Sequence, residues 1–306
     1  MNGDSRILLQ KGTLWEKIVT KTEESLKTGA QLPIPTAYEF IEDAGIRFFV
    51  RILSGLQQKD EDRLKRQESS SSGKTINPFL PYEKALYVAD ISDTHVALLN
   101  KFNVVENHLL LITRRFEDQE TLLTMRDFEA LWVCMAEYNA LGFYNGGEAA
   151  GASQPHKHLQ MAPLPLAPEG PGIPIEPLFE GAGSKGSPGT IPGLPFLHGF
   201  IRLEHNGIDS PIDAARNSFV LYGNMLSHVG LEPPKAEGIT RQSSPYCLLI
   251  TREWMLLVPR SQEFFNSISI NSLGFAGALL VRNGEQMDFL KKLGPMTALK
   301  SVALPS

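Results

Sequence analysis

The chain has 306 residues, of which 42% are hydrophobic and 21% are charged, and its formal net charge is −5. This length allows one large domain or two moderate ones, and the mildly acidic balance argues against broad electrostatic capture of nucleic acid. The two cysteines form no disulfide framework or Cys-x-x-Cys pair, which fits a reducing, cytoplasmic setting. We expect no secretory signal and no membrane span, because the first residues lead into no long apolar stretch and no run approaches eighteen apolar residues.

The first part of the chain is predicted to mix helices and strands. Residues 13–28 place apolar side chains on one helical face, and residues 46–53 have the composition of a strand. The polar segment 57–74 is predicted to be a surface loop. Three further strands are expected at 85–89, 95–99 and 108–113.

Residues 124–141 give the clearest helix prediction. Thr124 and Asp127 resemble a capping box at its start, apolar residues recur at helical spacing, and Gly142 is placed to end it. The following region, 143–162, is expected to be a loop and then a strand. Because residues 163–195 contain nine prolines and seven glycines, we expect a long irregular excursion there.

The last part is predicted to hold two helices and a hairpin. Ser210 and Pro211 suit the start of a helix over 210–229, and residues 246–259 fit a tight hairpin that turns at 252–253. Residues 267–282 fit either two β-like pieces or a strand and a helix, and 284–293 fit a short helix. We therefore divide the chain into residues 1–195, a catalytic region that includes the loop 163–195, and residues 196–306, packed on the same body.

The motif that carries chemistry follows a loop of small residues, 145–154. His156, His158 and Gln160 are spaced by two, so in an extended strand their side chains share one face, while Lys157 and Leu159 point to the other. A neutral imidazole is a good nucleophile at pH 7, and its attack on phosphorus splits one displacement into two steps. The pattern therefore predicts phosphoryl transfer through a histidine.

Two other interpretations stay open from the residues alone. The histidines could be ordinary strand residues, or they could bind zinc if remote ligands completed the site. The remote candidates are His95, His108, His198, His205 and His228.

The motif resembles the histidine-triad superfamily in its His-x-His-x-Gln branch. That branch includes galactose-1-phosphate uridylyltransferase and the diadenosine tetraphosphate phosphorylases, also called ATP adenylyltransferases. The string GASQPHKHLQ is similar to the phosphorylase form, and so are three further segments in the same order. They are NPFLPYEKAL at 77–86, LLNKFNVVENHLLLITRRFEDQ at 98–119, and NSLGFAGALLVR at 271–282.

The resemblance implies a specific site. His158 would be the nucleophile that attacks the α-phosphate, His156 would fix its tautomer through its carbonyl or its side chain, and Gln160 would hold a non-bridging phosphate oxygen. The remaining substrate-binding residues would be Arg51, Lys101, Asn145, Gly151, Ala152, Ser153, Gln154, Asn271, Ser272, Leu273 and Arg282. Lys101 fits an ordinary polar turn equally well. Arg282 stands where the family often has lysine, which keeps the charge but changes the geometry.

The expected fold is α+β, an antiparallel sheet with packed helices as in the triad superfamily and an extended C-terminal part. The expected reaction is phosphorolysis of diadenosine tetraphosphate to ATP and ADP through an adenylyl-histidine. Alternatives are a hexose-1-phosphate uridylyltransferase and a non-catalytic dinucleotide sensor. We expect no organic cofactor and no protein-bound metal, although Mg²⁺ could accompany the polyphosphate. The expected partners are nucleotides and phosphate, without nucleic acid or membrane, in a monomer or small homo-oligomer.

Overall fold

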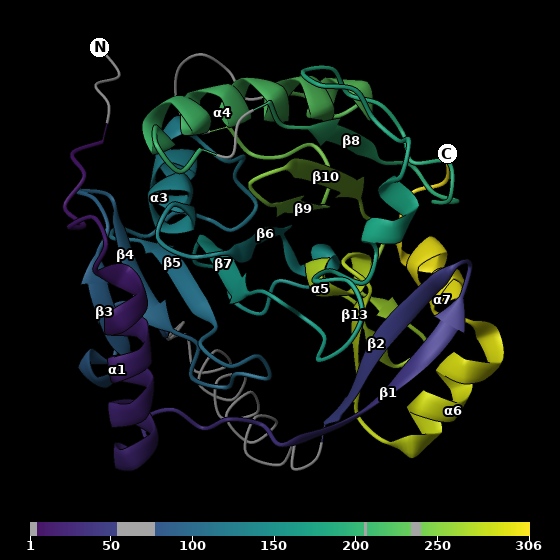
Figure 1. The fold of residues 1–306 in the computed structure, drawn as a ribbon, viewed down its shortest axis with the longest axis horizontal. Helices are drawn as coiled ribbons and strands as arrows, with labels where there is room; N and C mark the ends of the chain where they lie inside the picture. Colours follow the sequence, from purple (N-terminus) through teal and green to yellow (C-terminus); the bar gives the residue numbers. More distant parts are fainter. Residues whose placement is uncertain (1–4, 54–76, 205–206, 234–239) are drawn as a thin grey trace, which may run out of the picture.

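The computed structural model describes residues 5–53, 77–204, 207–233 and 240–306. The polar segment 57–74 and His205, both named in the sequence analysis, lie outside the described residues. Within them the fold is α+β and is built around a large antiparallel sheet (Figure 1). No helix in this part of the chain has the length and apolar character to cross a membrane.

The large sheet has eight strands in the order β3-β4-β5-β7-β6-β9-β10-β8, and every neighbouring pair is antiparallel. The strands are β3 (Tyr87–Asp90), β4 (His95–Leu99), β5 (Leu109–Thr113), β6 (Ala140–Gly146), β7 (His158–Pro163), β8 (Gly199–Arg202), β9 (Tyr246–Ile250) and β10 (Trp254–Pro259). Strand β7, which begins at the second motif histidine, lies between β5 and β6. The motif is therefore in the interior of the sheet.

A second sheet contains β1 (Thr36–Asp43), β2 (Ile46–Leu53) and β13 (Ala278–Val281). Strands β1 and β2 form a hairpin whose turn residues Ala44 and Gly45 both have positive φ, as a tight two-residue hairpin requires. Strand β13 pairs with β2 in parallel, so residues far apart in the sequence share this sheet. A small ribbon joins β11 (Phe264–Phe265) to β12 (Ile268–Ser269).

Helices cover the large sheet on one face and the small sheet elsewhere. On the first face lie α1 (Leu14–Thr28), α3 (Met125–Met135) and α4 (Pro211–His228), which bury their apolar stripes against the strands. Near the small sheet lie α5 (Ser272–Phe275), α6 (Gly284–Leu293) and α7 (Pro295–Val302), and Figure 1 shows α6 and α7 beside β1 and β2. Short 3₁₀ turns are η1 (Lys84–Leu86), η2 (Glu148–Ala150) and η3 (Glu176–Phe179).

Several predicted elements are confirmed, among them α1, β2, α4, α6 and the β9–β10 hairpin. The helix predicted over 124–141 is wrong in its second half, because α3 ends at Met135 and residues 140–146 form β6. Gly142 therefore lies inside a strand, where a Cβ atom would come within 2.9 Å of Leu131 Cδ1. The strand predicted at 85–89 begins as η1 and pairs only from Tyr87.

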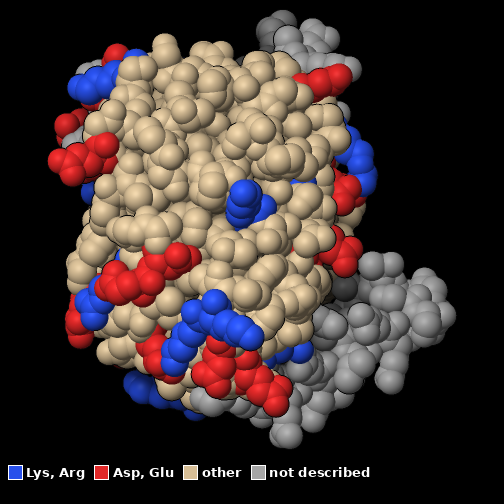
Figure 2. Space-filling model, turned by 90° about the vertical axis from the view of Figure 1, so that its right-hand side faces the viewer, with Lys and Arg blue, Asp and Glu red and all other residues tan. Residues whose placement is uncertain are grey.

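The face that carries the C-terminal helices mixes acidic and basic side chains. Figure 2 shows these charges in the lower part of the face and along its left and right margins, around a centre that is largely uncharged. No continuous basic area is visible among the described residues of this face.

Candidate active site

The motif side chains lie where the strand spacing predicts. His158 and Gln160 belong to β7, and His156 precedes it in an isolated bridge with Asp118. The relative exposures of His156, His158 and Gln160 are 0%, 3% and 9%. All three are thus held inside the protein, with imidazole and amide groups on one face of a central strand.

The orientation of His158 is fixed by one backbone carbonyl. Its Nδ1 lies 2.8 Å from the carbonyl oxygen of His156, and because a carbonyl only accepts, Nδ1 must carry the proton and donate. Nε2 is then the unprotonated nitrogen with a free lone pair. Burial lowers the pKa of His158 to about 4, so the ring is neutral at pH 7.

The His156 ring differs from the His158 ring in its hydrogen bonds. Its Nε2 donates to the carbonyl of Thr113 at 2.8 Å, and its Nδ1 accepts from the Asn77 side-chain amide at 2.8 Å. Both ring nitrogens are therefore occupied. The Phe79 ring packs edge-on against both motif histidines, with centroid separations of 5.6 Å and 5.4 Å.

Gln119 ties the motif strand to its neighbour. Its Oε1 accepts from the backbone N–H of His158 at 2.8 Å, and its Nε2 donates to the carbonyl of Asn145 at 2.9 Å. This buried side chain thereby fixes the spacing between the start of β7 and the end of β6.

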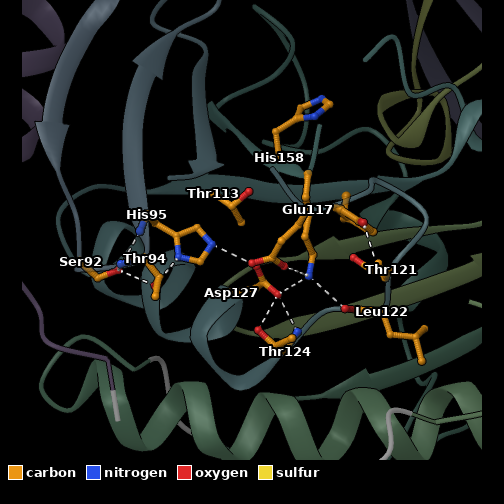
Figure 3. A network of polar contacts seen from close by, with 12 residues as sticks. Ser92, Thr94, His95, Thr113, Glu117, Thr121, Leu122, Thr124, Asp127 and His158 are labelled. Carbon is orange, nitrogen blue, oxygen red and sulfur yellow. Dashed lines mark hydrogen bonds and ion pairs between the residues drawn. The ribbon is translucent and has the colours of Figure 1, made fainter. Parts of the chain in front are cut away.

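Behind the motif, Lys157 projects to the opposite face and is fully buried. Its Nζ lies 2.8 Å from Asp127 Oδ2 and 3.0 Å from the carbonyl of Leu122, while Asp127 Oδ1 lies 3.0 Å from His95 Nε2. Burial alone would raise the pKa of Asp127, but the Lys157 ammonium and the His95 hydrogen bond hold it well below its usual range. In Figure 3 the His158 ring points away from this network.

The predicted phosphate loop and the C-terminal segment come together. Asn145 Oδ1 accepts from the backbone N–H of Ser272 at 2.9 Å and lies 2.7 Å from Ser272 Oγ. Gly151 has a φ of 90°, and a Cβ atom there would approach Asn271 Cβ to 2.7 Å, so only glycine fits. The structure thus unites predicted residues that are more than a hundred positions apart in the sequence.

The other residues predicted for these segments lie nearby along the chain. Asn271 Oδ1 accepts from the backbone N–H of Leu273 at 3.0 Å and caps α5, while the Leu273 side chain is in the core. Ser153 is exposed, and Ala152 and Gln154 are half-buried, in the loop that leads to His156. This loop therefore offers short polar groups next to the motif.

The three basic residues predicted to bind substrate lie in different surroundings. Arg51, on β2, donates to the carbonyl of Leu166 at 3.1 Å, and burial lowers its pKa to about 10. Lys101 forms an exposed ion pair with Glu83 at 3.0 Å. Arg282 is exposed just after β13. The described contacts do not bring Arg51 or Lys101 onto the motif histidines.

The residues that sequence reasoning missed are Asn77, Phe79, Thr113, Gln119 and Asp127. Asn77, Phe79, Thr113 and Gln119 fall in the segments that resemble the family, 77–86 and 98–119, and that was the only signal for them. The contacts of His156 with Asn77 and Thr113 span 79 and 43 positions, so no local spacing could reveal them.

Two of the histidines considered as zinc ligands are hydrogen-bonded to other groups. His95 is bonded to Asp127, and His198 donates from Nδ1 to the carbonyl of Phe196 while its Nε2 accepts from the N–H of Ile191. Within the ranges that the structure describes, no group of three or more His, Cys, Asp or Glu residues is placed to hold a metal ion.

Comparison with known proteins gives concordant matches along the chain. It is similar to diadenosine 5',5'''-P1,P4-tetraphosphate phosphorylase 2 of Saccharomyces cerevisiae, with 28% identity over 246 residues, 72% of this chain and 73% of that protein. It is also similar to Protein APA1 of the same yeast, with 26% identity over 215 residues, 61% of each chain.

The fold is similar to solved structures of yeast Ap4A phosphorylase Apa2. One crystal structure gives a TM-score of 0.77 at 23% identity, covering 97% of this chain and 96% of the other. The structure of the same enzyme in complex with Ap4A gives a TM-score of 0.77 at 22% identity, covering 97% and 99%.

Two family models match one after the other. The Ap4A phosphorylase N-terminal domain matches residues 4–181, and the ATP adenylyltransferase C-terminal domain matches residues 192–305. Since the first match alone spans more than half of the sequence, the chain belongs to the Ap4A phosphorylase and ATP adenylyltransferase family.

Proposed function

We propose that the protein is a diadenosine tetraphosphate phosphorylase, which converts this dinucleotide and inorganic phosphate to ATP and ADP. The observation that carries the proposal is the orientation of His158, whose Nδ1–H donates to the His156 carbonyl at 2.8 Å and leaves Nε2 bare. A nucleophile must present a lone pair at neutral pH, and this nitrogen does so. The yeast relatives that are named phosphorylases support the choice of substrate.

The reaction has two displacement steps. In the first, His158 Nε2 attacks the α-phosphorus of one adenylyl group, a P–N bond forms, and the P–O bond to the neighbouring phosphate breaks to release ATP. In the second, an oxygen of inorganic phosphate attacks the same phosphorus, the P–N bond breaks, and ADP leaves. The proton on Nδ1 stays hydrogen-bonded to the His156 carbonyl in both steps, which stabilises positive charge on the adenylylated ring.

The groups around His158 are proposed to stabilise the negative charge that develops on the phosphate oxygens. Gln160 lies two residues along the same strand face from His158 and would donate its amide to a non-bridging oxygen. The loop 151–154 and the segment 271–273 would contact the phosphate chain, with Asn145 beneath them. Arg51, Lys101 and Arg282 would act on the outer phosphates or the nucleoside. Mg²⁺ would arrive bound to the polyphosphate as part of the substrate.

Trapping of the intermediate tests the proposal. With diadenosine tetraphosphate labelled in its α-phosphates and no inorganic phosphate, the wild-type protein should retain label, and adding phosphate should release it as ADP. His158→Ala should retain no label and form no ADP. The matched control is His198→Gln, because His198 has the same Nδ1 bond to the carbonyl two residues earlier but lies outside the site. This control should label as the wild type does.

Three results would count against the proposal. Label that persists in His158→Ala would remove this residue as the nucleophile. Release by galactose 1-phosphate in place of inorganic phosphate would indicate a uridylyltransferase-like acceptor. Tight binding of the dinucleotide without label or ADP would indicate a sensor.

We also propose that the protein acts in the cytoplasm on small nucleotides, as a monomer or small homo-oligomer. Its two cysteines are both free and buried, which suits a reducing compartment.

A further inference from the structure

Arg260 lies at the end of the β9–β10 hairpin with its guanidinium inside the protein, and its relative exposure is 1%. All five of its N–H donors have a partner. The acceptors are the carbonyls of Val302 at 3.0 Å, Ala150 at 3.2 Å, Gln262 at 2.8 Å and Ile270 at 2.8 Å, together with Cys247 Sγ at 3.2 Å.

Two of these acceptors adjoin the segments assigned to phosphate binding. Ala150 precedes Gly151, and Ile270 precedes Asn271. Gly151 and Asn271 lie so close together that Gly151 has no room for a side chain. The Arg260 guanidinium binds the carbonyl of the residue before each of them, Ala150 and Ile270. Because a guanidinium is planar and rigid, the separation between its two Nη atoms sets the separation between these carbonyls. Arg260 therefore fixes the position of the loop relative to the segment that carries Asn271.

The charge of Arg260 has no acidic counterpart. Its partners are carbonyls, a thiol and the face of the Phe275 ring, whose centroid lies 5.1 Å from the guanidinium carbon, and among the described residues no carboxylate lies within 4.0 Å of it. A buried cation without a counter-ion is costly to keep, and its field is weakly screened in the protein interior. An anion bound beside Gly151 and Asn271 would supply the missing negative charge.

We infer that Arg260 is a positioning residue that clamps the phosphate loop to the Asn271 segment and contributes its unneutralised positive charge to the bound polyphosphate, an inference that rests on the proposed function. The clamp acts through the Ala150 and Ile270 carbonyls, and the charge acts through space. Arg260 does not touch the reacting atoms, since its donors are all used within the protein.

Binding of a series of ligands with increasing phosphate number separates the charge from a purely structural role. Dissociation constants of adenosine, AMP, ADP and ATP are measured by calorimetry for the wild type, Arg260→Met and Arg260→Lys. Arg260→Met should weaken ATP binding about tenfold while adenosine changes less than about twofold, with AMP and ADP between them. Arg260→Lys keeps the charge and should recover most of the ATP binding. It should still lower kcat, because one ammonium does not span both carbonyls.

Arg252→Met is the matched control. Arg252 donates to the carbonyl of Met135 from the opposite end of the same hairpin, so its loss should leave the whole ligand series unchanged. Equal losses for adenosine and ATP in Arg260→Met, or equal losses in the Lys and Met variants, would overturn the inference and leave Arg260 a structural residue.

If Arg260→Met does not fold, Arg260→Gln is measured with the same ligand series, because it removes the charge and keeps amide donors for part of the buried carbonyl set. ATP binding should again weaken more than adenosine binding, and equal losses for the two ligands would overturn the inference. Failure of the proposed function would show separately, as a wild-type protein that forms no ADP from diadenosine tetraphosphate and phosphate. Normal turnover with charge-independent losses would overturn only the role of Arg260.

Discussion

In the proposed mechanism the chemistry depends on a single nitrogen atom, His158 Nε2, and two features of the structure set its state: the burial of the ring and its bond to one backbone carbonyl. Burial lowers the pKa of His158 to about 4, while the bond from Nδ1 to His156 decides which nitrogen is bare. A neutral ring is the reactive form. The proposed nucleophile is therefore in its neutral form across the whole neutral pH range.

This lowered pKa predicts the pH dependence of the first step. Only the protonated ring is inactive, so ATP release in a single turnover should decline as the pH falls through about 4, and not near the ordinary histidine value of about 6.5. Single turnovers without inorganic phosphate are the right measurement, because phosphate itself titrates near neutrality. An acid limb near pH 6.5 would show that the ring is solvated in the working enzyme.

The same shift has a consequence for stability. The unfolded chain binds a proton at His158 near pH 6.5, whereas the folded protein resists it down to about 4. The free energy of unfolding should therefore fall as the pH drops through this interval.

At the scale of elements, Asp127 joins three parts of the fold. Its carboxylate is hydrogen-bonded to His95 of β4 and completes the capping box of α3 with Thr124. It also forms an ion pair with Lys157, the residue just before β7. The carboxylate thus anchors the back of the strand whose front carries His158. Because its folded pKa is depressed, its stabilisation is present above the unfolded value of about 4 and is lost as the pH falls below it.

Removal of both partners of the Asp127–Lys157 pair should cost less than the sum of the two single removals. Asp127→Asn leaves the Lys157 ammonium buried without its main counter-charge, and we expect a loss of about 3–5 kcal/mol in urea unfolding. The double variant Asp127→Asn with Lys157→Met should lose less than the two single variants added together. As a control, Lys21→Met breaks an exposed pair with Glu24 and should cost less than about 0.5 kcal/mol. Additive losses would contradict the coupling.

The elements that were predicted well are those with a clear local period. The helices at 13–28 and 210–229 and the hairpin over 246–259 show it, and so does the placement of three motif side chains on one strand face. The helix predicted over 124–141 failed because the apolar residues 140–143 fit a buried strand as well as a helix. Between the end of α3 and these residues, the Glu137 carboxylate accepts from the N–H groups of Gly12 and Leu14, a contact across more than a hundred positions that has no local sequence pattern.

The sequence predicted the site residues that are close together in the motif, but not those that distant segments bring to it. Spacing alone placed His156, His158 and Gln160 together, and the resemblance added the loop and the Asn271 segment. Gln119 and Arg260 act through backbone carbonyls and amides of distant segments, and such partners carry no sequence pattern.

At the scale of the whole molecule, the two predicted regions share their sheets. Strand β6 from the first region pairs with β9 from the second, and β2 pairs with β13. If the chain were cut after residue 195, the edges of β2 and β6 that pair with β13 and β9 would lose their partners. The division into residues 1–195 and 196–306 therefore remains a prediction about sequence regions and does not imply independent folding.

Shared sheets predict one cooperative unfolding transition. Calorimetry should give equal calorimetric and van 't Hoff enthalpies for the full chain, and residues 1–195 expressed alone should show no hydrogen-exchange protection in β6. A second transition, or native protection of β6 in the fragment, would show that the first region is a folding unit by itself.

The bond from Arg260 to the carbonyl of Val302 also has a meaning for synthesis on the ribosome. Residue 302 is synthesised after His158 and after the loop at Gly151, so this bond can form only once residue 302 has left the ribosome. Every motif residue is therefore synthesised before the Arg260 side chain has its full set of acceptors. We expect a chain shortened before residue 302 to keep the motif and to hold the Arg260 side chain less firmly.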